Sequence, residues 1–413
     1  MAAAAAVAET RPSAELSFMP QKSFNWPIVC TAFLVAFFGW GLGFYGPSVF
    51  LQTLHAERGW SVSTISSAIT LHYLVSAVLV AYLPNIYRRF GLPRVSVVGF
   101  FFAAAGVAGW SLVTEPWQLF PVALISAVGW GTMNSAAVNA IVAPWFDKDR
   151  PRAISMAFNG ASCGGLAFTP LWVALIGHFG FFEAALLVGA GMLMVMLPLA
   201  ATVLRRDPPG EARAEVHGAG GRTRATLMRD RGFLTISLAF ALALFAQVGM
   251  VAHFIARLAP EFGPNGAAWT LSLVTLCAVA GRSLLTRFMH DENRRRVAAV
   301  NFLMQAAGTA LFTFGGGLPT MLAGCVLFGL GFGNLVSLPP LLVQREFSGP
   351  EIGRAVALIV AVNQAVFAFS PAALGIMRDF AGSYTASFAV ATTLQLLAAA
   401  IVLLGRPRVR SRA

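Results

Sequence analysis

The sequence predicts an all-α membrane protein of twelve transmembrane helices, arranged as two six-helix, pseudo-symmetric bundles. Of its 413 residues, 57% are hydrophobic and 11% charged, with a mean hydropathy of +0.72; soluble domains carry roughly 25% charged residues. Apolar runs of about 18 or more residues, each long enough to cross a bilayer as a helix, recur along nearly the whole chain. The two halves of the chain also share a repeated pattern, which indicates related bundles.

The apolar runs between charged residues predict the individual helices, because they lack the alternation of an outer-membrane barrel strand. The first bundle, 26–204, contains expected helices at 26–54, 62–86, 93–113, 117–146, 152–179 and 182–204. The second bundle, 232–405, contains expected helices at 232–259, 266–289, 296–315, 318–345, 352–379 and 383–405. We expect the remaining segments to be an N-terminal tail (1–25), an Arg-, Gly- and Pro-rich linker (205–231) and a C-terminal tail (406–413).

The positive charges predict how the chain lies in the membrane. All but four of the 29 lysines and arginines fall on the side of the two termini; the exceptions are Arg58, Arg257, Arg378 and Arg282. Cytoplasmic loops carry such an excess, so we expect an inner (plasma) membrane protein whose tails and linker are cytoplasmic. The formal charge of +12 then comes from these loops rather than from a surface for nucleic acid, which is not an expected partner.

Several other features indicate ordinary membrane-protein segments. Glu9 and Arg11 interrupt the N-terminal Ala tract too early for a secretory signal, which favours a short tail. The cysteines fall singly in four apolar runs, as packing residues do, at positions Cys30, Cys163, Cys277 and Cys325. We expect no metal site, no cofactor and no catalytic residue, and we expect a monomer.

The halves repeat a motif at corresponding places in the fourth and tenth helices. Gly129, Gly131 and Asn134 recur as Gly329, Gly331 and Asn334. Small residues alone could serve helix packing, but the common register predicts parallel six-helix repeats with a substrate site at the midplane between them.

Two loops resemble those of a known family. The turn 88–94 (RRFGLPR) resembles the loop motif of the major facilitator superfamily, and 145–153 (WFDKDRPRA), followed by a Gly-rich helix, resembles its monocarboxylate transporter and oxalate/formate exchanger branch. The resemblance implies a secondary carrier that works by alternating access. One departure is that Arg88 replaces the family's loop aspartate, so the usual salt bridge between the halves on the cytoplasmic side is not expected.

Arg282 is the candidate centre of the site. The 17 acidic residues lie in loops or near helix ends, so no carboxylate is expected beside it at mid-depth. Arginine at the bilayer centre costs about 2.5–3.5 kcal/mol on the insertion scale, and an unpaired guanidinium favours an anion that it can bind bidentately. The resemblance also implies a substrate-binding arginine in the eighth helix. The alternative is that Arg282 snorkels or binds backbone carbonyls.

The sequence differs from the monocarboxylate transporter and oxalate/formate exchanger branch at several positions. These differences bear on the charge of the cargo and on whether transport is coupled to protons. Where the oxalate exchanger has a second cation, a lysine in the eleventh helix, this chain has Asn363 and Gln364, which favours a monoanion. Where the animal carriers have a lysine and an aspartate, it has Ser48 and Ala278, so their proton coupling does not carry over. His72 and His253 are the candidates for proton coupling, because imidazole titrates near neutrality; a structural histidine is the alternative, and uniport or exchange for a counter-anion stays open.

Other polar side chains in the expected helices could line the path. They are Tyr45, Tyr73, Asn134, Asn159, Gln247, Asn334, Asn363 and Gln364. Each could instead form an interhelical hydrogen bond, worth roughly 0.6 kcal/mol.

Together these features favour a carrier of a small organic anion, a monocarboxylate, in the lipid bilayer. An exporter of amphiphilic drugs or metabolites is the alternative, since 34 Phe and 13 Met are available to line a greasy cavity. A membrane enzyme or non-transporting sensor is disfavoured by the lack of paired intramembrane carboxylates, a His cluster or an appended soluble domain. The chain also has no phosphate-binding Gly-x4-Gly-Lys-Ser/Thr motif for ATP-driven transport.

Overall fold

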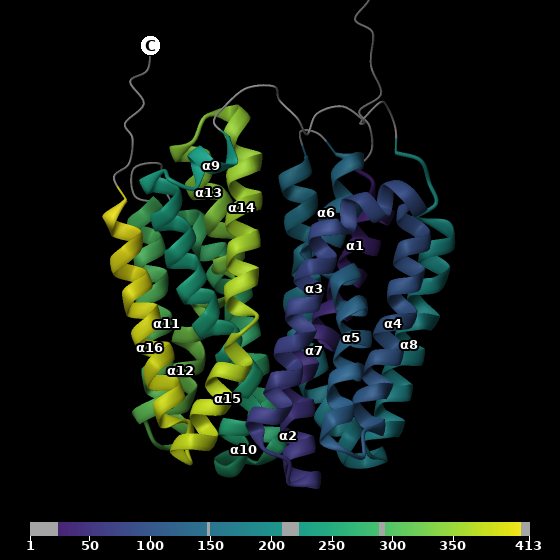
Figure 1. Ribbon diagram of the computed structural model, residues 1–413, viewed down its shortest axis with the longest axis vertical. Coiled ribbons are helices and arrows are strands. Elements are labelled where there is room, and N and C mark those ends of the chain that lie inside the picture. Colours follow the sequence, from purple (N-terminus) through teal and green to yellow (C-terminus); the bar gives the residue numbers. More distant parts are fainter. Residues whose placement is uncertain (1–23, 147–148, 209–222, 289–293, 406–413) are drawn as a thin grey trace, which may run out of the picture.

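The structure, a computed structural model, describes residues 24–146, 149–208, 223–288 and 294–405. Within these ranges the chain forms two helical bundles that lie side by side (Figure 1). One bundle is coloured purple to blue-teal and the other green to yellow, so each is built from one half of the sequence. Both bundles have their long helices roughly parallel, as expected for segments that cross a bilayer.

The N-terminal bundle is built from eight α-helices and three short segments of other helical geometry. These are α1 (Trp26–Trp40), the π-helix η1 (Gly41–Tyr45), α2 (Gly46–Arg58), α3 (Val62–Phe90), α4 (Leu92–Leu112), η2 (Pro116–Gln118), α5 (Leu119–Met133), α6 (Ser135–Val142), η3 (Ala143–Trp145), α7 (Arg150–Phe179) and α8 (Phe181–Thr202). A short helix, α9 (Arg224–Leu227), lies in the region predicted as the linker; residues 209–222 of that region lie outside the described residues.

The C-terminal bundle follows the same plan. It consists of α10 (Arg231–Phe288), α11 (Arg294–Phe314), α12 (Gly317–Phe332), α13 (Asn334–Glu346), α14 (Gly349–Phe367), α15 (Ser370–Ala381) and α16 (Tyr384–Leu404). The predicted tails, 1–25 and 406–413, lie almost wholly outside the described residues.

Within the described residues, ten helical segments are long and apolar enough to cross a membrane. One of them runs through Gly263, whose positive φ of 69° breaks the helical conformation, so this segment makes two passes. The pair α5–α6 makes a further pass, although each member is too short alone. The predicted twelve-helix membrane fold is therefore confirmed.

Three helices predicted as continuous are each two helices, which corrects the predictions 117–146, 318–345 and 352–379. At Asn134 the backbone is extended and the side-chain Oδ1 accepts the Ala136 N–H at 2.9 Å, which starts a new helix. A second break lies at Gly333, between α12 and α13. The third break precedes Pro371, which has no N–H to continue the hydrogen-bond ladder. Irregular backbone at membrane depth is tolerated where it is buried in protein or lines a cavity.

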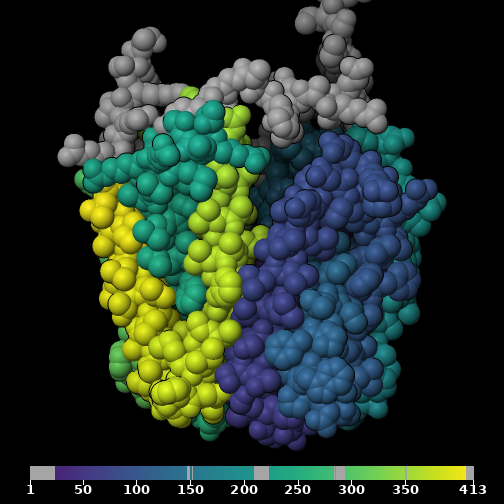
Figure 2. All heavy atoms as spheres, viewed as in Figure 1, coloured from purple at the N-terminus to yellow at the C-terminus, as the bar shows by residue number. Residues whose placement is uncertain are grey.

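The two bundles meet at mid-depth and at one end only. We call the end where α8 finishes and α10 begins the linker end, and the opposite end the far end. The short far-end helices α2 and α15 pack against α10 and α3 of the other bundle, and α7 packs against α10. At the linker end the surface is hollowed between α14 and α3 (Figure 2). The conformation is thus closed at the far end and open at the linker end.

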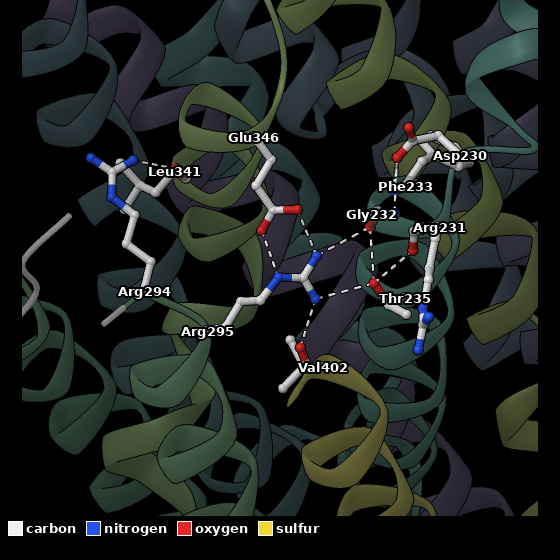
Figure 3. A network of polar contacts seen from close by, with 10 residues as sticks. All are labelled: Asp230, Arg231, Gly232, Phe233, Thr235, Arg294, Arg295, Leu341, Glu346 and Val402. Carbon is white, nitrogen blue, oxygen red and sulfur yellow. Dashed lines mark hydrogen bonds and ion pairs between the residues drawn. The ribbon is translucent and has the colours of Figure 1, made fainter. Parts of the chain in front are cut away.

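A buried ion pair fastens the linker end of the C-terminal bundle (Figure 3). Arg295, at the start of α11, donates from Nε and Nη2 to the two carboxylate oxygens of Glu346 on α13, at 2.5 and 2.6 Å. Its Nη1 donates to Val402 O on α16 at 2.6 Å and to Thr235 Oγ1 on α10 at 3.1 Å. The Arg295 guanidinium therefore links α10, α11, α13 and α16 through its hydrogen bonds. Both charged side chains are less than a tenth exposed.

Removing the carboxylate should destabilise this bundle. Glu346→Gln would leave the Arg295 charge buried without its counter-ion, which typically costs about 3–5 kcal/mol. We expect the thermal unfolding midpoint of the detergent-solubilised protein to fall by several degrees. The control is Glu261→Gln, because Glu261 pairs with Arg257 at a half-exposed i,i+4 site where a pair contributes about 0–1 kcal/mol. Equal midpoints for the two variants would contradict the assigned role.

Candidate functional site

Arg282 lies in the second pass of α10 and reaches across to the other bundle. Its Nη1 donates to Asn159 Oδ1 at 3.3 Å and its Nη2 to Ser162 Oγ at 3.4 Å, both on α7. These are long hydrogen bonds to neutral acceptors, and none of the ion pairs found among the described residues includes Arg282. Its side chain is half-buried. The structure therefore places a guanidinium at the boundary of the two bundles, and within the described ranges no carboxylate pairs with it.

Two glycines make room for the side chains that meet at this boundary. If Gly333 carried a side chain, its Cβ would lie 2.9 Å from Arg282 Nη2 and 3.0 Å from Ala278 O. The glycine at the break between α12 and α13 therefore leaves space for the guanidinium. A Cβ at Gly165 on α7 would lie 2.5 Å from Tyr45 Cζ. Any larger residue at either position would have to displace the group that faces it.

Tyr45 and Tyr73 line the same boundary. Tyr45, in η1, lies within electrostatic range of Arg282, and Tyr73, in α3, lies within the same range of Tyr45. The Tyr45 ring lies 6.5 Å from the Phe332 ring of α12, and the Tyr73 ring lies 6.3 Å from the Phe367 ring of α14. Each tyrosine of the N-terminal bundle thus faces a phenylalanine of the other bundle, so two aromatic pairs cross the boundary between the bundles.

Among the predicted site residues, the structure brings Arg282, Asn159, Tyr45 and Tyr73 together. The predictions missed Ser162, Phe332 and Phe367. A serine in a Gly-rich helix and two of the 34 phenylalanines carry no signal in the sequence that separates them from packing residues. Ser162, Phe332 and Phe367 are recognised as neighbours of the site only from the way α7, α12 and α14 approach α10 in the structure.

Gln247 and Asn363 are buried, and the side-chain oxygen of each has no hydrogen-bond partner among the described residues. They lie on α10 and α14, which pack against each other, and the neighbouring Gln364 is half-buried. An unsatisfied buried amide is costly, so these groups are suited to a partner that this conformation does not provide.

Asn134 and Asn334 form their hydrogen bonds within their own bundles. Asn134 caps α6, as described above, and Asn334 Nδ2 donates to Asn301 Oδ1 at 2.9 Å and to Leu330 O at 3.1 Å. In this conformation both asparagines therefore stabilise helix breaks, and no hydrogen bond found among the described residues joins either to Arg282.

His72 and His253 occupy equivalent chemical surroundings in the two bundles. Each ring has one nitrogen against a carbonyl oxygen, at 3.1 Å for His72 (Gly43) and 2.8 Å for His253 (Pro371). The other nitrogen lies against a hydroxyl, at 2.8 Å for His72 (Ser126) and 3.3 Å for His253 (Tyr384). A hydroxyl can donate or accept, so either protonation state of the imidazole keeps both hydrogen bonds.

The two histidines differ in location. His72 borders a small cavity of about 20 Å³ inside the N-terminal bundle, with room for about one water. His253 lies where the bundles meet. If Gly375 carried a side chain, its Cβ would lie 3.3 Å from His253 Cε1 and would also collide with Ser66 of the other bundle. Of the two imidazoles, His253 is the one that movement between the bundles would affect directly.

The site as a whole combines one cation, neutral hydrogen-bonding groups and aromatic walls between two bundles that are closed at one end. Such a site can bind a small anion with an apolar body and expose it to one side at a time. Among the described residues there is no group of three or more His, Cys, Asp or Glu that could hold a metal ion, and the four cysteines are free.

The solved structures of two transporters have the same fold. The nucleoside transporter NupG superposes with a TM-score of 0.70 at 14% sequence identity, covering 91% of this chain and 98% of that one. A bacterial homologue of the human lysosomal transporter Spinster, in an inward-facing and occupied conformation, gives a TM-score of 0.65 at 12% identity, covering 91% and 96%. At these identities the similarity establishes the fold alone.

Several curated proteins resemble the sequence over most of its length. MFS-type transporter 1 of Ophiocordyceps sp. (strain BCC 1869) is 28% identical over 357 residues, covering 82% of this chain and 75% of the relative. Monocarboxylate transporter 13 of Bos taurus is 26% identical over 397 residues (94% and 90%), and monocarboxylate transporter 11 of Homo sapiens is 24% identical over 414 residues (94% and 84%). Residues 29–291, more than half of the chain, match the Major Facilitator Superfamily, and the protein belongs to this family of transmembrane transporters.

Proposed function

We propose that the protein is a carrier for a small organic monoanion, a monocarboxylate, which it binds at Arg282 between the two bundles. The observation that carries this proposal is the guanidinium at the bundle boundary, whose hydrogen-bond partners in the described part of the chain are the neutral Asn159 and Ser162. The similarity to proteins named monocarboxylate transporters supports the same cargo class.

The geometry favours exchange of these partners for a carboxylate. The present hydrogen bonds run from the guanidinium to two neutral oxygens and are long, at 3.3 and 3.4 Å. A carboxylate would accept from two N–H groups of the guanidinium at once and would also neutralise its charge. A dianion would leave one negative charge uncompensated at this depth, because Arg282 is the one cation in the spans of the sequence. We therefore propose a single carboxylate, with its apolar part against the Tyr45–Phe332 and Tyr73–Phe367 ring pairs.

We propose further that the linker end faces the cytoplasm, as the distribution of positive charge favours. The structure then corresponds to an inward-open state, in which cargo reaches Arg282 from the cytoplasm while the far end is closed. Transport requires the bundles to rock about the site, so that the far end opens and the linker end closes.

The aromatic ring pairs also support a second candidate function, the export of amphiphilic drugs or metabolites. An amphiphile could stack between the same four rings without using the guanidinium. Dependence of transport on Arg282 separates the two functions.

Replacing the cation tests the monocarboxylate proposal. We expect Arg282→Gln to raise the half-saturation concentration for monocarboxylate uptake into proteoliposomes at least about tenfold, because a charge-assisted interaction of about 1.5–3 kcal/mol is lost. Arg282→Lys should be impaired to a lesser extent, since it keeps the charge but loses the bidentate geometry. The measurement is the initial rate of uptake of labelled monocarboxylates over a range of concentrations.

The matched control is Arg257→Gln, which removes an arginine paired with Glu261 at the far end and should leave the half-saturation concentration unchanged. Unaltered saturable uptake in Arg282→Gln would refute the anion site. Saturable transport of uncharged amphiphiles by both wild type and Arg282→Gln would support the exporter instead.

We propose that His253, rather than His72, couples transport to protons. His253 contacts Pro371 at the break before α15 and lies beside the far-end closure. The titratable and charged groups around it are Tyr384, Arg378 and Asp379, all on the C-terminal bundle. A change of charge on His253 would therefore be felt where the bundles separate, whereas His72 lies inside one bundle.

An imposed pH gradient tests this assignment. We expect an inward proton gradient to accelerate monocarboxylate uptake by the wild type and by His72→Gln, and we expect His253→Gln to lose the acceleration while keeping downhill uptake. Initial rates with and without the gradient measure the effect. An acceleration that persists in His253→Gln, or a wild type that ignores the gradient, would remove His253 from the coupling role.

A further inference from the structure

Asp379 makes a contact between the bundles that none of the site residues explains. It lies near the far end of α15, and its Oδ2 accepts the backbone N–H of Ser63 at 2.7 Å. Ser63 is the second residue of α3, which begins at Val62. The carboxylate of the C-terminal bundle therefore caps the N-terminus of a helix in the other bundle.

The first turn of α3 is capped from two sides. The first N–H groups of a helix have no partner within the helix and carry a partial positive charge, so they favour a carboxylate. Ser61, the N-cap residue, accepts the Thr64 N–H on its Oγ at 3.2 Å. Asp379 accepts the Ser63 N–H from across the boundary. The Ser61 cap belongs to the same segment as α3 and stays in place when the bundles move. The Asp379 cap comes from the other bundle and exists only while the far end is closed.

Arg378 positions the carboxylate. Its Nη1 donates to the other oxygen of Asp379, Oδ1, at 2.9 Å, and its guanidinium lies 5.9 Å from the centre of the Tyr384 ring of α16. One oxygen of Asp379 is thus held by its own bundle and the other is presented to α3. The pair is partly exposed, with about a quarter of each side chain accessible.

The hydrogen bond from Ser63 to Asp379 lies at one end of a line of contacts between α3 and α15, which we call the seam. A Cβ on Gly375 would lie 2.0 Å from Ser66 Oγ, and the Ala372 N–H donates to Thr70 Oγ1 at 3.0 Å. Side chains three or four residues apart share one face of a helix, so the seam pairs one face of α3 with one face of α15 in antiparallel order. Its members are Ser63, Ser66 and Thr70 on α3, and Asp379, Gly375 and Ala372 on α15.

We propose that Asp379 is a gate residue: its cap on α3 stabilises the conformation closed at the far end and so sets how often the carrier opens there. Opening of the far end must separate α3 from α15. This separation breaks the hydrogen bond between Asp379 and the Ser63 N–H, and it leaves the carboxylate and the N-terminus of α3 without each other. The gate acts whatever the cargo is, and it requires no role for Arg282 or His253.

Distances between spin labels at the far end test the proposal without any cargo. Labels on Glu57→Cys at the end of α2 and Thr385→Cys at the start of α16 would report the separation of the two bundles, in a background with Cys30, Cys163, Cys277 and Cys325 replaced by Ala. Both labelled residues are exposed. We expect Asp379→Ala to raise the ratio of far-end-open to far-end-closed molecules at least about tenfold, as the loss of a charge-assisted hydrogen bond implies.

Companion variants make the result specific. Asp379→Glu keeps an anionic acceptor and should restore most of the closed population, and Asp379→Asn, which keeps an acceptor without the charge, should fall between. Gly375→Val should open the far end by steric conflict with Ser66. The matched control is Glu261→Ala, since Glu261 is also a far-end carboxylate paired with an arginine, but its partner Arg257 lies on its own helix, α10.

The proposal is overturned if the Asp379→Ala distances coincide with those of wild type and Glu261→Ala while Gly375→Val shifts them. It is also overturned if Asp379→Asn matches wild type, because the carboxylate charge would then contribute nothing. Either result would leave the monocarboxylate proposal untouched, since this measurement uses no cargo.

Discussion

The constraint on which the arrangement depends is the charge of Arg282 at the boundary of two apolar bundles. Hydrocarbon does not solvate an unpaired guanidinium, so the charge must be met by protein groups, water or a ligand. Here the guanidinium donates two long hydrogen bonds to α7, and the lack of a side chain at Gly333 leaves it space. These neutral partners hold the guanidinium without neutralising its charge, which is the basis of our proposal that a carboxylate takes their place.

The rest of the fold permits this boundary to open on one side at a time. One hydrophobic core runs through the N-terminal bundle and continues into the C-terminal bundle through residues such as Phe254, Phe328 and Phe388. A second core, with the Arg295–Glu346 pair beside it, lies wholly within the C-terminal bundle. The contacts between bundles combine this shared apolar packing with single hydrogen bonds, among them those to Thr70 and Ser63, and with a close approach at Gly375. Opening of the far end has to separate the α3–α15 part of this boundary.

The sequence was sufficient to predict the membrane fold, since runs of apolar residues and the placement of arginines follow directly from the solvent around each segment. It also singled out Arg282, because a lone cation in a span is conspicuous, and the binding role of this arginine stays a prediction. It was not sufficient for the breaks at Asn134 and Gly333, where local capping and packing override an apolar run. Phe332, Phe367 and Asp379 were missed for another reason: their roles depend on contacts with Tyr45, Tyr73 and Ser63, which are hundreds of residues away in the chain.

The central claim is that Arg282 binds the carboxylate of the cargo, and binding itself is its most direct test. A ligand at free concentration c that binds only the folded protein stabilises it by RT ln(1 + c/Kd), so its unfolding temperature keeps rising with the ligand concentration. We expect a monocarboxylate to raise the unfolding temperature of the purified wild type in this logarithmic way, and the same concentrations to have no effect on Arg282→Gln. An equal rise in both proteins would contradict the claim, and so would a wild type that responds to no monocarboxylate.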